Sequence, residues 1–133
     1  MTCMSIDLPE SVRRLVGWAH DKKAFDVVVL DLRESSAFTD YFVFCSAQST
    51  RQARAIVDGI MKHLRASHAR PSHVEGYDRA DWVLIDCFEI IIHVFTHETR
   101  RFYDLERLWG AARRIVCEPP RPSEAAPPLR TDQ

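Results

Sequence analysis

The chain has 133 residues, of which 46% are hydrophobic and 28% are charged. This is the length and composition of one globular domain with its own core. Its 18 Lys and Arg against 19 Asp and Glu give a formal net charge of -1, which excludes a protein that holds nucleic acid through bulk positive charge. The sequence has no run of about 18 apolar residues and no secretory signal at its start, so we expect no membrane segment and a cytoplasmic location.

The first part of the chain predicts one helix and two strands. The helix is expected to begin after Asp7, because four apolar residues follow at helical spacing, namely Val12, Leu15, Val16 and Ala19. Runs of β-branched and large apolar residues predict a strand over residues 25–32 and another over residues 41–45.

The clearest predicted element is the helix that follows Ser49. Ser49 and Gln52 have the spacing of a capping box, in which side chains satisfy backbone N–H groups at the start of a helix. One face of this helix carries an unbroken apolar stripe, formed by Ala53, Ile56, Val57, Ile60, Met61 and Leu64. The other face carries charged residues, namely Arg51, Arg54, Asp58, Lys62 and Arg65. The helix is therefore expected to pack its stripe on a sheet.

The later part of the chain predicts three more strands and a last helix. Residues 72–75 form a short strand, and the tight link after residues 82–87 makes an antiparallel hairpin with residues 90–95. Residues 96–109 combine a turn with a short helix. The prediction is a single α/β domain over residues 1–117, with a mixed five-stranded sheet flanked by about three helices.

The composition changes after Cys117. Residues 118–133 contain five of the seven prolines and no aromatic residue. Such a segment lacks the apolar surface that would offset the entropy of ordering it. We therefore predict a proline-rich disordered tail over residues 118–133.

The predicted strand at residues 82–87 presents two sets of side chains, because alternate residues of a strand point to opposite faces. One set consists of Val83, Ile85 and Cys87. The other set consists of Trp82, Leu84 and Asp86. Few helices remain to cover the second face, so Trp82 and Leu84 are expected to stay partly exposed as a partner surface. The alternative is that the first or last helix covers Trp82 completely.

Catalysis is not expected. A two-metal nucleotidyl-transfer site needs paired carboxylates on a strand, and the sequence contains no Asp-x-Asp. Asp104 and Glu106 are the nearest equivalent, but residues two apart on a helix do not face each other. Asp86 and Glu89 flank a hairpin turn, where solvated acids are common. The four glycines are too scattered for a phosphate-binding loop, so no nucleotide cofactor is expected.

Metal binding and cysteine chemistry are not expected either. His93 and His97 would lie on one face of an extended chain but about 13 Å apart, which is too far for one metal ion. No cysteine lies in a C-x-x-C pair. Cys45 and Cys87 occur in apolar strands, where we expect small buried side chains in a reducing compartment.

Four separated stretches carry a family resemblance. They read DVVVLDLR and SSAFTDYFV (26–33 and 35–43), STRQ (49–52), VEGYDRADWVLID (74–86) and IIHVFTHETRRFYDLERLWG (91–110). Together they resemble the ribosomal silencing factor family, also called the Iojap-like family, over residues 8–116. The chain departs from the family pattern at Cys87, Phe88 and Glu89, where the family more often has an aromatic residue, a glycine and an acid. The loss of that glycine bears on the geometry of the hairpin turn.

The resemblance implies a fold similar to a nucleotidyltransferase that has lost its catalytic carboxylates, and a translational repressor that is not an enzyme. It implies binding to the large ribosomal subunit through ribosomal protein L-fourteen, steric blocking of subunit joining, and assistance in large-subunit assembly. It further implies a homodimer when the protein is free, and the basic helix face has the charge for a minor ribosomal RNA contact. The implied ribosomal-protein interface consists of Trp82, Leu84, Asp86, Arg100, Tyr103 and Trp109.

Two other functional classes remain open on the sequence alone. A small nucleotidyltransferase-like enzyme on the same scaffold would need metal-binding acids. A plain dimerisation module would use Trp82 and Leu84 for self-association.

Overall fold

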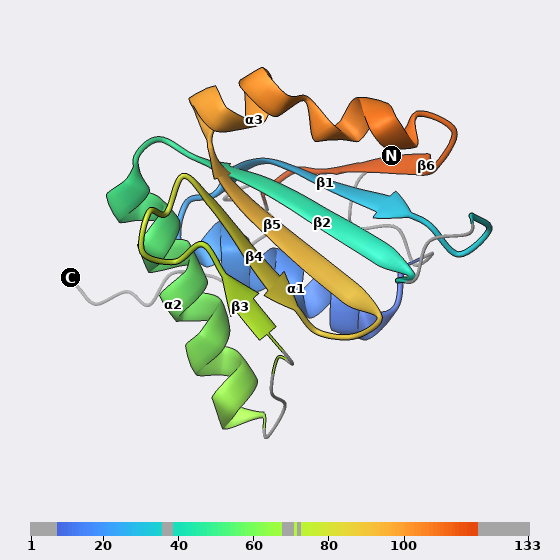
Figure 1. Cartoon of the computed structure of the whole chain (residues 1–133). Helices are drawn as coiled ribbons and strands as arrows, with labels where there is room; N and C mark the ends of the chain where they lie inside the picture. Colours follow the sequence, from blue (N-terminus) through green and yellow to red (C-terminus); the bar gives the residue numbers. More distant parts are fainter. Residues whose placement is uncertain (1–7, 36–38, 68–70, 72, 120–133) are drawn as a thin grey trace.

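The computed structural model describes residues 8–35, 39–67, 71 and 73–119. The helices are α1 (Glu10–Asp21), α2 (Thr50–Ala66), α3 (His97–Tyr103) and the 3-10 helix η1 (Leu105–Trp109). The strands are β1 (Phe25–Asp31), β2 (Tyr41–Ala47), β3 (His73–Glu75), β4 (Trp82–Asp86), β5 (Ile90–Thr96) and β6 (Arg113–Cys117). These strands form one sheet in the order β3-β4-β5-β2-β1-β6 (Figure 1).

The sheet is mixed, as predicted. Among the described strands β2 and β5 pair in parallel, and every other neighbouring pair is antiparallel. The predicted hairpin of β4 and β5 is confirmed, with Trp82 opposite Phe95 and Ile85 opposite Ile92. The parallel pairing of β2 and β5 is possible because α2 and the strands after it return the chain to the same end of the sheet.

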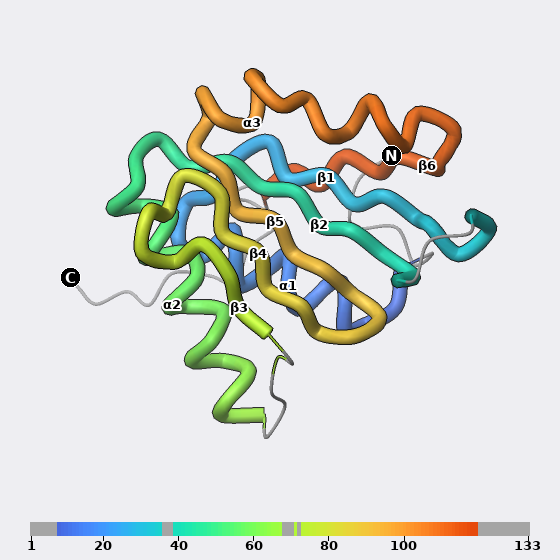
Figure 2. Tube along the Cα trace, in the orientation of Figure 1, coloured from blue at the N-terminus to red at the C-terminus, as the bar shows by residue number. Residues whose placement is uncertain are grey.

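The predicted number of five strands is wrong, because the described chain has a sixth strand, β6. This strand pairs antiparallel with β1, beside which it runs in Figure 2. Only Ile115 and Cys117 are buried in it, while Arg113 and Arg114 are exposed. An edge strand of this kind has little apolar periodicity, and its pairing partner lies near the other end of the sequence.

The helix starts differ in how well the sequence marks them. At α2 the predicted cap is confirmed, because the Ser49 hydroxyl accepts a hydrogen bond from the Gln52 N–H at 3.1 Å. The Gln52 side chain accepts from the Gln48 N–H at 2.7 Å, one residue earlier than a capping box would have it. At α1 the N-cap residue is Pro9, and Asp7 lies outside the described residues.

Buried apolar residues form two clusters on opposite faces of the sheet. The first face packs against α1 and α2, and its cluster includes Val29, Val43, Ile56, Ile60, Val83, Ile85, Ile92 and Val94. The second face carries Val28, Leu30, Leu32, Phe42, Phe44, Ile91 and Phe95. Strand alternation assigns each side chain to its face, so β1, β2 and β5 are apolar on both sides.

The second face has a smaller cover than the first. Of the elements in the described residues, only α3 and η1 lie over it, and neither contributes a buried residue. Figure 1 shows α3 along one rim of the sheet, with α1 behind the strands. The β3 and β4 part of this face is therefore left open beside α3.

None of the described helices combines the length and the apolar character needed to cross a membrane.

Candidate protein-docking surface

Strand β4 separates its side chains as the alternation predicts. Val83 and Ile85 are fully buried in the first cluster. Trp82 and Leu84 are half-buried and pack against the second cluster from its open side. The prediction that these two side chains stay partly exposed is confirmed. We call the open region formed by Trp82, Leu84, Asp86, Phe102 and Tyr103 the β4–α3 surface.

The indole of Trp82 is held in a fixed position. Its Nε1–H donates to Nδ1 of His93 at 3.1 Å. Its ring stacks on Phe95 at 5.2 Å between centroids, and Tyr103 of α3 contacts it from the solvent side at 5.2 Å. The last helical segment therefore covers Trp82 only in part, and the exposed portion is rigid.

His93 lies in the second cluster and not on the surface. It is 3% exposed, between the rings of Phe42 and Phe44, each 4.9 Å away. Burial lowers the pKa of His93 to about 4, so the ring is neutral near pH 7. Because Nδ1 accepts from Trp82, the proton of the neutral ring resides on Nε2. His93 thus serves as an acceptor that orients the indole.

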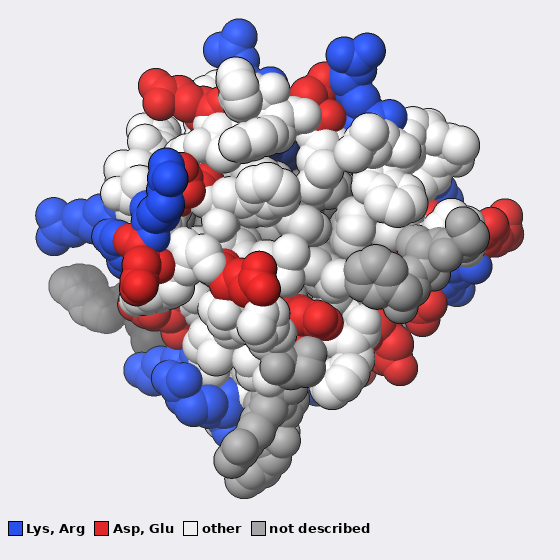
Figure 3. Space-filling model, viewed as in Figure 1, with Lys and Arg blue, Asp and Glu red and all other residues white. Residues whose placement is uncertain are grey.

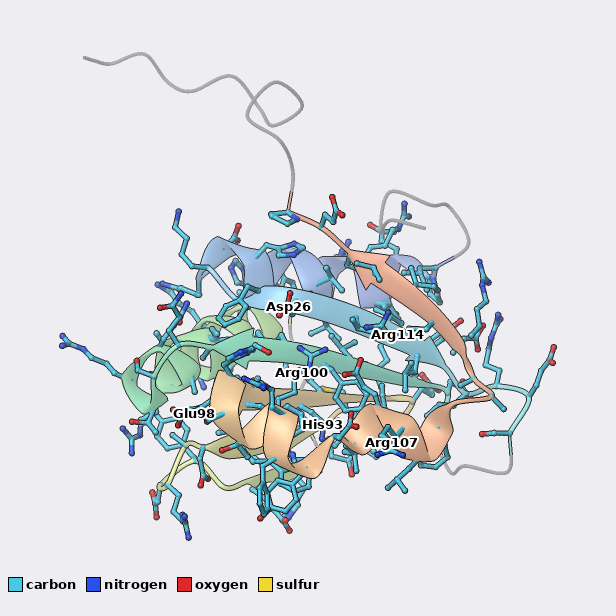
Figure 4. The ribbon with its side chains drawn as sticks, turned by 90° about the horizontal axis from the view of Figure 1, so that it is seen from above. Asp26, His93, Glu98, Arg100, Arg107 and Arg114 are labelled. Carbon is cyan, nitrogen blue, oxygen red and sulfur yellow. The ribbon has the colours of Figure 1, made fainter. Side chains whose placement is uncertain are left out.

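Arg100 is turned inward. Its side chain is only 11% exposed and forms an ion pair with Glu106 at 3.3 Å. The guanidinium also donates to the Ser46 hydroxyl at 2.8 Å and to the backbone carbonyl of Asp26. Figure 4 shows Arg100 reaching from α3 towards the strands, with Asp26 beyond it. This arrangement makes Arg100 an anchor that fixes α3 on the sheet.

The position of Asp26 explains why its carbonyl is available. Asp26 has a positive φ of 50°, at the irregularity where the pairing of β1 with β2 shifts register. A bulge turns one carbonyl away from the strand ladder and leaves it without a strand partner. Arg100 supplies that partner, so the bulge and the anchor form one unit.

The segment after α3 is fixed in the same way. Glu106 also pairs with Arg114 of β6 at 3.5 Å, which ties η1 to the edge strand. Trp109 is half-buried and packs edge-on against Phe42 at 5.4 Å. Trp109 therefore mainly closes the second cluster, at a distance from the open β4 strand.

The sequence reasoning missed three exposed apolar residues, of which Phe88, in the turn after β4, is 67% exposed. Phe102 is 80% exposed and packs edge-on against Tyr103, and Leu108 is 74% exposed. A signal for Phe102 and Leu108 exists in the sequence, because residues 102–109 contain more large apolar side chains than one short helix can bury. Figure 3 shows mostly uncharged side chains and a few acidic ones across the middle of the molecule in this view, with Lys and Arg mostly at the periphery.

A pocket of about 560 Å³ adjoins the β4–α3 surface. Its walls include the aromatic side chains of Tyr77, Trp82 and Tyr103, together with Asp78 and Asp81. Asp81 pairs with Arg79 at 3.1 Å, an exposed pair of little stabilising effect. Aromatic faces beside carboxylates suit a basic side chain of a partner.

The acids considered for catalysis do not converge. Asp104 pairs with Arg107 at 3.6 Å, whereas Glu106 faces Arg100 and Arg114. Asp86 accepts from the backbone N–H of Phe88 at 2.9 Å. Among the described residues, no group of three His, Cys, Asp or Glu side chains is placed to hold a metal ion.

Cys45 lies in β2, whereas Cys87, which the prediction placed in a strand, lies one residue past the end of β4, and both have the environment of structural residues. Cys45 is fully buried, and burial raises its pKa to about 12. Cys87 is half-buried, and burial raises its pKa to about 11. Both thiols are therefore protonated near pH 7 and poorly nucleophilic.

Comparisons with known proteins converge on one family. The family model described as ribosomal silencing factor during starvation matches residues 5–133. Ribosomal silencing factor RsfS of Halalkalibacterium halodurans is 36% identical over 109 residues, which is 82% of this chain and 93% of the relative. RsfS of Bacillus subtilis is 38% identical over 92 residues, 69% of this chain and 78% of the relative.

A eukaryotic relative and two solved structures extend the comparison. The mouse protein named mitochondrial assembly of ribosomal large subunit protein 1 is 36% identical over 98 residues, 71% of this chain and 43% of the mouse protein. A crystal structure from Bacillus halodurans has a TM-score of 0.69 at 36% identity, covering 75% of this chain and 93% of that one. A Chromobacterium violaceum structure has a TM-score of 0.73 at 24% identity, covering 84% and 88%, and supports the fold.

Proposed function

This chain belongs to the ribosomal silencing factor family, and on that premise we propose that it represses translation by binding the large ribosomal subunit through ribosomal protein L-fourteen. The docked domain then blocks joining of the small subunit by steric exclusion. The name of the mouse relative supports a further role in assembly of the large subunit. We place this activity in the cytoplasm and assign it no catalytic step.

The observation that carries the proposal is the β4–α3 surface. Trp82 is half-buried and rigidly held, while Phe102 and Tyr103 of the adjoining helix are 80% and 54% exposed. A fixed aromatic side chain at the centre of an open apolar patch is the usual form of a protein-binding hot spot. Large apolar groups left on a surface otherwise carry a solubility cost.

The charge around this surface favours a basic partner. Asp78, Asp81 and Arg79 line the pocket beside Trp82, where Arg79 pairs with Asp81 and Asp78 remains as the excess acid, and Asp86 lies at the other end of β4. Proteins that contact ribosomal RNA carry Lys and Arg in excess, so their exposed edges complement such acids.

The residues of the implied interface separate into two roles. We assign direct contact to Trp82, Leu84 and Tyr103, with Asp86 at the rim. We assign positioning to Arg100 and Trp109, because their side chains are directed into the second cluster. Positioning residues act on binding through the placement of α3 and η1.

The free protein is proposed to be a homodimer, and α2 to add a minor ribosomal RNA contact. Arg51, Lys62 and Arg65 are exposed on the outer face of α2, whereas Arg54 donates to the carbonyls of Tyr77 and Asp78. Any RNA contact of α2 therefore depends mainly on the three exposed basic residues. Sedimentation equilibrium of the purified protein measures the dimer.

Co-sedimentation with purified large subunits tests the main proposal. We expect Trp82→Ala to weaken binding about thirtyfold, the effect of losing roughly 2 kcal/mol at a hot spot. The matched control is Trp18→Ala, because Trp18 is also half-buried but stacks on His63 at the α1 and α2 side of the sheet. Trp18→Ala should leave binding unchanged.

Thermal melting of both variants separates binding from folding. A Trp82→Ala protein that is well folded and binds with unchanged affinity contradicts the proposed surface. In that event Tyr103→Ala is the next variant, since its ring is the other exposed aromatic group against Trp82.

A further inference from the structure

Phe88 occupies an unusual place in the turn between β4 and β5. The Cys87 N–H donates to the Ile90 carbonyl at 2.8 Å, which leaves Phe88 and Glu89 as the two central residues. Of these two, only Phe88 has a positive φ, at 71°. In a two-residue hairpin, a central position with a positive φ is normally held by glycine, or by Asn or Asp.

A phenylalanine at this position is unfavourable for the fold. A positive φ strains a residue with a bulky side chain, because its Cβ crowds the backbone. Burial does not offset that strain, since Phe88 is 67% exposed. Glycine would adopt the same backbone without the steric conflict.

The contacts that hold the turn do not involve the ring. The Phe88 N–H donates to the Asp86 carboxylate at 2.9 Å, and the Phe88 carbonyl accepts from the Thr39 hydroxyl at 3.1 Å. Both bonds use backbone atoms that glycine also has. The turn is therefore braced on both sides while it presents an exposed aromatic ring.

We propose that the Phe88 ring is a further anchor of the β4–α3 surface, where it contacts the same ribosomal protein and contributes to specificity for it. This inference rests on the proposed function. Phe88 lies two residues beyond β4, at the end of the strand opposite Trp82, and its N–H bonds to Asp86, the member of the β4–α3 surface at that end. A ring on a braced turn loses little conformational freedom on binding, so it contributes more affinity than an equally exposed side chain on a mobile loop.

The test measures stability and binding on the same variants. Phe88→Gly should raise the Tm by a few degrees and weaken binding to large subunits roughly five- to tenfold. Phe88→Ala keeps the strained φ and lacks the ring, so it should weaken binding equally without the gain in Tm. Phe88→Tyr keeps the ring and should bind like the unmodified protein. A side chain with a merely structural role would not move stability and affinity in opposite directions.

The outcomes distinguish this inference from the function on which it rests. If the unmodified protein binds large subunits and Phe88→Gly binds equally well, the inference is overturned and the proposed function stands. If Phe88→Gly lowers the Tm, the ring stabilises the fold and the inference is overturned. If Phe88→Gly weakens only the homodimer, the ring serves self-association and the inference is again overturned. If the unmodified protein does not bind large subunits, the proposed function itself fails.

Discussion

The two faces of the sheet are built from the same strands but are covered very differently. On the first face α1 and α2, of 12 and 17 residues, bury apolar stripes against the strands. On the second face α3 and η1, of 7 and 5 residues, bury no residue completely. The first face is a closed hydrophobic core, whereas the second remains partly available for binding.

Polar side chains hold the short cover of the second face in place. Inside the second face, Trp82 bonds to His93, and Arg100 bonds to Glu106, Ser46 and the carbonyl of Asp26. Hydrogen bonds fix direction where apolar packing alone is insufficient. A short cover that is held by such bonds keeps exposed aromatic side chains in place without burying them.

The largest loss of stability is expected on the buried face of β4, which can be compared with its open face through two neighbouring residues. Ile85→Ala should cost about 2 to 5 kcal/mol of unfolding free energy, because Ile85 is fully buried. Leu84→Ala should cost about 1 kcal/mol, since Leu84 is only half-buried, but should weaken large-subunit binding. Urea denaturation measures the first effect and co-sedimentation the second. Equal losses of stability would show that the second face is as closed as the first.

The anchor of α3 gives the next effect. Arg100→Met should cost about 2 to 4 kcal/mol, because it leaves Glu106 without one partner and the Asp26 carbonyl without its donor. Arg107→Met is the control, since Arg107 is 82% exposed in its side chain. Hydrogen exchange should show faster exchange in α3 and η1 for Arg100→Met, with the amides of β2 and β5 unchanged. Uniform acceleration across the sheet would argue against a local anchor.

Acid should weaken the second face through His93. The folded-state pKa of His93 is about 4 because of burial, against about 6.5 when unfolded. Between these pKa values the unfolded state binds more protons than the folded state. The contribution of neutral His93 to the unfolding free energy is therefore fully present above about pH 7 and is lost as the pH drops towards 4. From pH 8 to pH 5 the loss is about 2 kcal/mol.

His93→Gln is the variant that isolates this dependence. The amide does not titrate, so its unfolding free energy should change less between pH 8 and pH 5 than that of the unmodified protein. His20 also has a lowered pKa, mainly from burial, and contributes in the same direction in both proteins. Identical pH profiles for the two proteins would exclude His93 as the titrating group.

The smallest effect is expected at the C-terminal tail. Residues 120–133 lie outside the described residues, and the composition of residues 118–133 remains the reason to predict disorder there. A chain that ends at Glu118 should keep its Tm and its affinity for large subunits. A substantial loss of either would show that the tail takes part in folding or docking.

Features that depend on local pattern could be predicted from the sequence alone. Helical and strand periodicity predicted three helices and five of the six described strands, and the Ser49 cap followed from its spacing to Gln52. Alternation along β4 correctly separated Ile85 from Trp82 and Leu84. These features were predictable because propensity, capping and face assignment depend on residues that are close in the chain.

Features that depend on partners distant in the chain became known only from the folded structure. β6 is a strand because β1 pairs with it, and the strand order has no local signal. The inward direction of Arg100 depends on a carbonyl that the β1 bulge turns towards α3, so its place in the sequence could not distinguish an anchor from a contact residue. The strain at Phe88 arises when β4 and β5 close a two-residue turn, which fixes a φ that the sequence alone does not specify.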